Sequence, residues 1–143
     1  MSAAPPVIRH ASNLMRDIEL AVVCFPRRHR YVSGQDLRTH ATKVAQLAIR
    51  AWRRPEKRIE IVDSLVDAVD DMKLSMQLAK ELHAFASFSQ FEDLARKASE
   101  LGREVGGWNK HLHPQGQNAA PRAALQRART LSTHDASMVE ANS

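Results

Sequence analysis

The sequence is poor in the residues that build cross-linked, fibrous or membrane-spanning proteins. Its 143 residues include one cysteine, five glycines and six prolines, which excludes an internal disulfide, a cysteine-rich zinc site and a collagen-like composition. No apolar run approaches the roughly 18 residues of a membrane span. The first six residues lack the charged start and apolar stretch of a secretory signal. We therefore expect a cytoplasmic protein that does not enter a membrane.

Sequence signatures of catalysis are also missing. The chain has no P-loop, no Gly-x-Gly-x-x-Gly and no nucleophile elbow. It has no Glu-x-x-His pair, which a carboxylate-bridged di-metal bundle requires. Cys24 follows an apolar segment without an acid–base pair nearby in sequence, so we expect a buried cysteine acting as a small hydrophobe. The sequence predicts no enzyme activity, no cofactor and no metal site.

What the sequence does contain is helical periodicity. Apolar residues recur at steps of three and four over residues 7–25, 34–53, 56–85 and about 89–112. Pro26, Pro55 and Pro114 mark helix ends. Two pairs resemble capping boxes, Ser33 with Asp36 and Ser89 with Glu92. In the third segment the stripe expected to face inward consists of Ile59, Val62, Leu65, Val66, Val69, Met72, Met76, Ala79 and Leu82.

Four amphipathic helices with short connections can bury their apolar stripes only against one another. The predicted fold is therefore all-α, an up-down-up-down four-helix bundle over residues 8–113. Residues 1–7 are expected to be disordered. Residues 114–143 have little large apolar content, so we expect a flexible C-terminal tail.

Positive charge is concentrated in one part of the chain. The formal net charge is +5, but residues 27–58 carry ten Lys or Arg against two carboxylates, a net +8, whereas residues 59–113 have a net charge of −4. On a helical wheel the basic residues of 34–53 share the outward half. Two interpretations stay open, a solvated face and a surface that binds nucleic-acid phosphates or a partner. The candidate residues are Arg27, Arg28, Arg30, Arg38, Lys43, Arg50, Arg53, Arg54, Lys57 and Arg58.

Glycines and one isoleucine are candidates for helix packing or a subunit interface. Glycine inside a helix costs about 1 kcal/mol relative to alanine, so Gly102 and Gly106 should be compensated by the close approach of a helix, within the bundle or from another subunit. Trp108 would supply a large contact beside them. Ile49 lies among polar residues and hints at a contact between subunits.

Three separated segments carry a family resemblance. They are Phe25-Pro-Arg-Arg-His-Arg-Tyr31 followed by Gly34, Leu37 and Arg38, then Ser87-Phe-Ser-Gln-Phe91, then Leu101-Gly-Arg-Glu-Val-Gly-Gly-Trp108. In this order, over about residues 10–112, they resemble the accessory variability determinant (Avd) proteins of diversity-generating retroelements.

The resemblance implies a four-helix bundle that assembles into a homopentameric barrel with a basic surface. It also implies a non-catalytic protein that associates with the element's reverse transcriptase and its template RNA to support mutagenic copying. Arg27, Arg28, Arg30 and Arg38 become the best candidates for contact with nucleic acid or the polymerase. A related set of bundles, encoded in intervening sequences of ribosomal RNA genes, leaves open the alternative of an oligomeric protein–protein adaptor.

Overall fold

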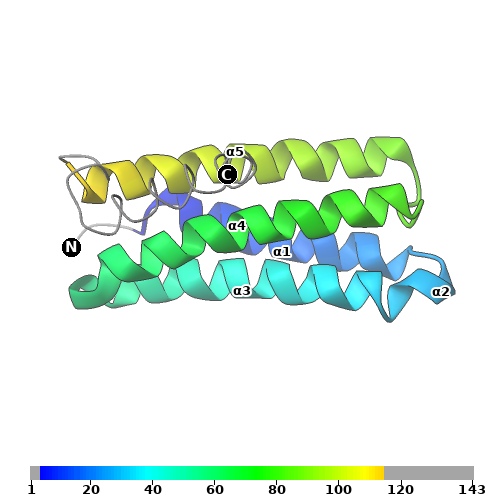
Figure 1. Cartoon of the computed structure of the whole chain (residues 1–143), viewed down its shortest axis with the longest axis horizontal. Helices are drawn as coiled ribbons and strands as arrows, with labels where there is room; N and C mark the ends of the chain where they lie inside the picture. The colour runs from blue at the N-terminus through cyan, green and yellow to red at the C-terminus, as the bar shows by residue number, and fades with distance from the viewer. Residues whose placement is uncertain (1–3, 115–143) are drawn as a thin grey trace, which may run out of the picture. The chain divides into compact units, whose positions relative to one another are not determined.

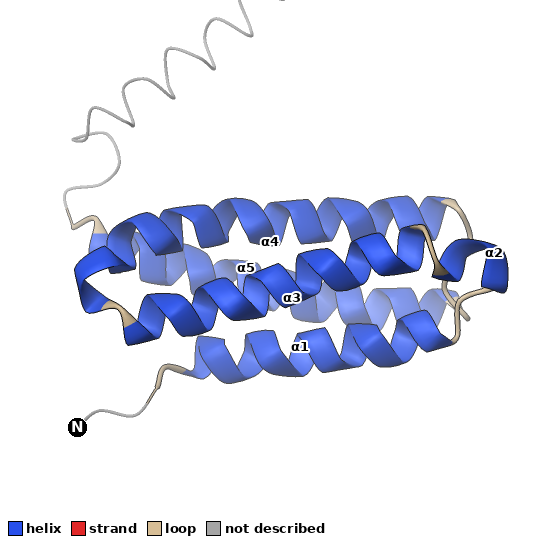
Figure 2. Cartoon of the chain, turned by 90° about the horizontal axis from the view of Figure 1, so that it is seen from below, coloured by secondary structure: helices blue, strands red, loops and turns tan. Residues whose placement is uncertain are grey.

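The computed structural model describes residues 4–114, and in this range the chain is helical with no strand. Four long helices, α1 (Pro6–Val23), α3 (Ser33–Arg53), α4 (Arg58–Glu81) and α5 (Phe88–Leu112), lie alongside one another within residues 4–109, as Figures 1 and 2 show. Successive long helices run in opposite directions (Figure 1), which confirms the predicted four-helix bundle. The expected flexible tail, 114–143, lies outside the described residues from position 115 onward.

Helix α1 spans Pro6–Val23 and begins earlier than expected. Proline is favoured in the first turn because the amide hydrogen it lacks would have no partner there. Val7 is 4% exposed and belongs to the core, so the prediction of disorder through residue 7 is wrong for its last two residues. The prediction for Cys24 is also wrong, since this residue caps the helix and is exposed.

The basic segment after α1 is not simply a loop. Residues Arg27–Arg30 form a one-turn helix, α2, and Ser33–Arg53 form α3. The predicted capping box at the start of α3 is not found, because Val32 is the N-cap residue and no side chain caps the helix. The Asp36 carboxylate instead accepts a hydrogen bond of 2.8 Å from Ser75 Oγ on the neighbouring α4.

Helix α4 is shorter than the predicted segment 56–85. A 3-10 turn, η1, occupies Pro55–Lys57, and α4 spans Arg58–Glu81. At its C-terminal end, His83 has a φ of 59°, His83 N–H donates to the Lys80 carbonyl and Ala84 N–H donates to the Ala79 carbonyl. This is a Schellman cap, normally built on glycine. Ile59 and Leu82, expected to face inward, are each 48% exposed.

Helix α5 spans Phe88–Leu112, and its N-terminus differs from the prediction by two residues. Ser87 Oγ accepts a hydrogen bond of 3.1 Å from Gln90 N–H, and Gln90 Oε1 accepts one of 3.0 Å from Ala86 N–H. Ser87 and Gln90 therefore cap the helix in place of Ser89 and Glu92. The signal was readable in the sequence, because Ser-x-x-Gln satisfies the same rule as Ser-x-x-Glu.

An aromatic cluster closes the core at the end of the bundle that carries α2. The ring of Phe85 lies 5.1 Å from that of Phe25, edge to face, and 5.5 Å from that of Phe91. Phe25 is 1% exposed. Gly34 lies at the same end, where a side chain would clash with Val22. These contacts fix the position of α2 and its arginines against the bundle.

Candidate nucleic-acid interface

Seven of the ten predicted basic residues lie on the surface. They are Arg27, Arg28, Lys43, Arg50, Arg53, Arg54 and Lys57. None of the seven forms an ion pair within the described part of the chain. Arg27 and Arg28 are in α2, and Lys43, Arg50 and Arg53 are on α3. Arg54 follows α3, and Lys57 is in η1. Because α2 and η1 flank opposite ends of α3 (Figures 1 and 2), the seven residues, here called the cationic surface, lie at both ends of α3 and on its C-terminal half.

The three remaining predicted residues are engaged within the fold. Arg38 forms a 2.9 Å ion pair with Glu19 of α1. Arg30 is half-buried and donates to the Phe25 carbonyl over 3.3 Å. Arg58 donates to the carbonyls of Ala51 and Trp52, each over 2.9 Å. The structure therefore gives Arg30, Arg38 and Arg58 an architectural role, and the ten residues do not form one uniform surface.

The caps made by Arg58 explain the turn between α3 and α4. The last carbonyls of a helix lack partners within the helix, and the guanidinium of Arg58 donates hydrogen bonds to two of them. Its Cζ also lies 5.5 Å from the centroid of the Trp52 ring, a cation–π contact. The Trp52 ring is therefore engaged in a contact within the protein, with Arg58.

A polar groove lies between α1 and α3 along the cationic surface. Its volume is about 650 Å³, and Lys43 and Arg50 line it with the Arg38–Glu19 pair and the polar side chains Gln35, Thr39, Thr42 and Gln46. Amide and hydroxyl groups of this kind bind phosphate and sugar oxygens, but by themselves they do not specify sequence. The groove therefore suits contact with a nucleic-acid backbone.

The predicted packing residues lie in different surroundings. A Cβ atom on Gly102 would stand 3.0 Å from Lys73 Nζ and 3.7 Å from Val69 Cγ1, so Gly102 meets side chains of α4 and not its backbone. A Cβ on Gly106 would meet nothing within 4 Å in the described part of the chain, so the packing inside the bundle expected for Gly106 is not found. Ile49 and Trp108 are half-buried. A subunit contact for these residues stays a prediction.

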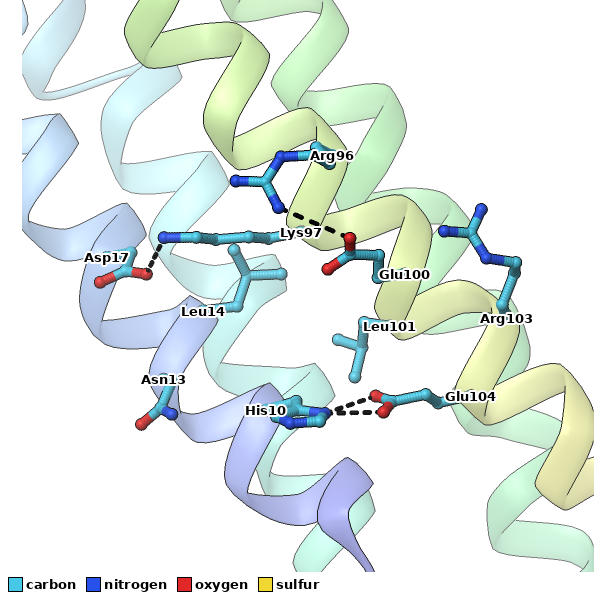
Figure 3. A pocket seen from close by; sticks show the side chains of 10 residues that line it. All are labelled: His10, Asn13, Leu14, Asp17, Arg96, Lys97, Glu100, Leu101, Arg103 and Glu104. Atoms are coloured by element: carbon cyan, nitrogen blue, oxygen red, sulfur yellow. Dashed lines mark hydrogen bonds and ion pairs between the residues drawn. The ribbon is translucent and has the colours of Figure 1, made fainter.

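A second polar groove lies between α1 and α5 (Figure 3), and the sequence did not indicate it. In this cavity of about 550 Å³, His10 Nδ1 lies 2.7 Å from Glu104 Oε2, and Lys97 Nζ lies 2.9 Å from Asp17 Oδ2. The hydrogen bond with Asp17, followed by that with Asp93, raises the pKa of Lys97. The hydrogen bond from Lys97 in turn lowers the pKa of Asp93. These charges neutralise one another, so the groove offers no surface of one sign.

Within residues 4–114 no group of three or more His, Cys, Asp or Glu side chains is placed to hold a metal ion. None of the helices in this range is long and apolar enough to cross a membrane. Comparisons with protein-family models, with curated proteins and with solved structures each gave no match. The assignment of function therefore depends on the surfaces of this chain and on the resemblance of its sequence motifs.

Proposed function

We propose that this protein is a non-catalytic accessory subunit of a diversity-generating retroelement. In this function it binds nucleic acid through its cationic surface and associates with the reverse transcriptase to support mutagenic copying of the template RNA. The proposal is carried by the seven exposed basic residues of α2, α3 and the turn that contains η1, which form no ion pair within residues 4–114. The three motifs that resemble Avd proteins supply the biological setting.

The chemistry of the cationic surface favours recognition of the nucleic-acid backbone. Proteins that bind single strands usually add aromatic side chains on which bases stack. Of the aromatic residues nearest in sequence to the cations, Trp52 is already stacked with Arg58, which leaves Tyr31 after α2 as an exposed ring. Binding should therefore depend on phosphate contacts and on salt, with little dependence on base sequence.

A salt titration of labelled RNA tests nucleic-acid binding directly. In the test variant Arg27, Arg28, Arg50 and Arg54 are changed to Gln. In the control variant, which removes the same charge elsewhere, Arg9, Arg16, Arg96 and Arg103 are changed to Gln. The test variant should bind RNA more weakly, and its slope of log K against log salt should be shallower by up to about 3, since each phosphate contact contributes about 0.7 on single strands. Equal losses in both variants, or a flat salt dependence of the wild type, would refute a specific surface.

Two further measurements test the retroelement setting. The proposal includes a homopentamer, so the mass in solution should be five times the 16.0 kDa of one chain. A reverse-transcriptase gene and paired template and variable repeats should lie beside the coding gene. If they are absent while RNA binding holds, the protein is a nucleic-acid-binding bundle of another system. If RNA binding also fails, the protein–protein adaptor becomes the better assignment.

A further inference from the structure

An apolar groove opens between α3 and α4 on the surface of the bundle. It has a volume of about 710 Å³ and lies near the α2 end. Its walls include Tyr31, Val32, Leu78 and Leu82, which are 67%, 73%, 54% and 48% exposed, and its floor includes Ala79, which is fully buried. Four large apolar side chains gathered around one groove form a contiguous patch of the kind that marks an interaction site.

The apolar face continues along α4 beyond the groove. Leu74, Leu78 and Leu82 recur every four residues, and all three are about half exposed. Residues at this spacing share one side of a helix, so α4 has a second apolar stripe in addition to the one that faces the core. From Leu74 to Leu82 this stripe is about 12 Å long, slightly more than two helical turns.

The charged residues that line the groove are acidic, although the chain as a whole is basic. Among the described residues, Asp36 and Glu81 line the groove and no Lys, Arg or His does. The two lysines of the same part of α4 do not line the groove. Lys73 lies against Gly102, and Lys80 Nζ lies 5.3 Å from the Phe91 ring centroid and 3.7 Å from Glu81 Oε2. Asp36 also lies 3.5 Å from His40 Nε2, but the side chains of Asp36 and Glu81 are 58% and 64% exposed and both pairs are long. Exposed pairs of this kind contribute little, so both carboxylates can still bind a cation of a partner.

From this combination we infer that the groove is a docking site for a basic amphipathic helix of a partner protein. Leucines of such a helix would pack on Tyr31, Leu78 and Leu82, as in other complexes that place an amphipathic helix in a groove. Its lysines or arginines would face Asp36 and Glu81, and charge complementarity of this kind steers association and fixes the register of binding. Nucleic acid is disfavoured here because the carboxylates repel phosphate.

A second copy of this chain fits the groove less well. Its basic outward face, on α3, offers Ile49 as the only large aliphatic residue among the cations, and Ile49 is half-buried. The partner helix must bring several apolar side chains to cover Tyr31, Val32, Leu78 and Leu82. The docking site shares Gln35 and Thr39 with the polar groove beside Lys43 and Arg50, but it contains none of the seven cations. Leu78 and Leu82 do not line that polar groove, so substitutions there test the docking site separately.

Fluorescence anisotropy with two synthetic probes tests the site. One probe is an amphipathic helical peptide with leucines on one face and lysines on the other, and the second carries glutamates in place of the lysines. The full chain should bind the lysine peptide, and the glutamate peptide should bind about tenfold more weakly or worse, because opposite charges favour the first complex and like charges oppose the second. Equal binding of both peptides, or no binding of the lysine peptide, would overturn the inference.

Three variants locate the binding on the protein. Changing Leu78 and Leu82 to Ser should weaken the lysine peptide about tenfold or more, since apolar anchors carry most of the energy of such interfaces. Leu20 and Val23 of α1 are similarly exposed. Changing both to Ser should leave the affinity for the lysine peptide within about twofold of the wild type, because residues distant from an interface contribute little. Glu81→Lys should weaken the lysine peptide and strengthen the glutamate peptide. Identical affinities for the groove and α1 variants would contradict the assigned location.

Two controls separate this occupant from the others. Sedimentation of the Leu78→Ser/Leu82→Ser variant should give the same mass as the wild type, whereas a fall in oligomeric state would show that a second copy occupies the groove. RNA affinity of this variant should also match the wild type. A tenfold loss of RNA binding would assign the groove to nucleic acid and overturn the inference.

Discussion

Gly34 lies against Val22 so closely that a Cβ atom on the glycine would stand 2.6 Å from Val22 Cγ1. The same atom would lie 3.4 Å from the carbonyl oxygen of His29 and 3.4 Å from the Phe25 ring. Val22 is fully buried and cannot move aside without disturbing the core. The start of α3 therefore packs against the end of α1 only because position 34 has no side chain.

This packing predicts that Gly34→Ala destabilises the bundle. Overpacking of this kind costs about 1–3 kcal/mol, to be measured as the free energy of unfolding in urea. Gly106→Ala is the matched control, because its Cβ would meet no atom of residues 4–114 within 4 Å, and it should raise stability by up to about 1 kcal/mol through helix propensity. Equal effects of the two substitutions would contradict the close approach at Gly34.

The N-terminal cap of α5 gives a second prediction. Removing the Ser87 hydroxyl leaves the Gln90 amide without the side-chain partner that now lies 3.1 Å away. Ser87→Ala should lower the free energy of unfolding by about 1 kcal/mol. Ser89→Ala, within the first turn, should change it by less than about 0.5 kcal/mol. Thermal unfolding of both variants measures the two effects. If Ser89 and Glu92 capped the helix instead, Ser89→Ala would be the more destabilising substitution.

Helix content and topology were predictable because they follow from local patterns. The apolar periodicity of α1, α3 and α5 and the stops at Pro26, Pro55 and Pro114 gave the bundle correctly. The end of α4 was missed because its cap places His83 in the left-handed region, where glycine is the usual signal. The short helix α2 was missed because four residues are too few to show a period.

The candidate surface was only partly predictable for a different reason. Charge density along the sequence identified the ten basic residues, but sequence spacing does not show which cation meets a carbonyl or a carboxylate of another element. Arg38 pairs with Glu19, which is far from it in the chain. The groove on α4 was missed because Leu82 was assigned to the core, although the period-four series with Leu74 and Leu78 was visible in the sequence.

Arg58 should contribute to the stability of the fold, whereas the adjacent Lys57 should contribute little. Arg58→Met retains the aliphatic stem but removes both hydrogen bonds to the end of α3 and the contact with Trp52. The free energy of unfolding should fall by about 1–3 kcal/mol, as for other lost hydrogen bonds from charged groups. Lys57→Met, at an exposed position, should have an effect within about 0.5 kcal/mol. Urea unfolding of both variants measures the difference, and equal stabilities would show that the caps contribute nothing.

The bridge between Lys97 and Asp17 should stabilise the α1–α5 contact in a defined pH range. Because the pKa of Lys97 is raised in the folded state, its contribution is complete below the ordinary lysine pKa and is lost as pH rises through the folded value. The pKa of Asp93 is lowered, so its contribution is present above the ordinary aspartate pKa and is lost as pH falls through the folded value. The pairs are partly exposed, so the Lys97–Asp17 bridge is worth at most about 1 kcal/mol.

Lys97→Met should therefore be less stable than the wild type by a constant amount near neutral pH. The difference in the free energy of unfolding should shrink in strong acid and in strong alkali, and it should also shrink as added salt screens the pair. Lys43→Met is the control, because Lys43 is exposed and forms no ion pair within residues 4–114. Denaturant unfolding across pH gives the profile of each variant. A Lys97→Met deficit that keeps its size at both extremes of pH would mean that the lysine stabilises the bundle through the packing of its stem and not through its charge.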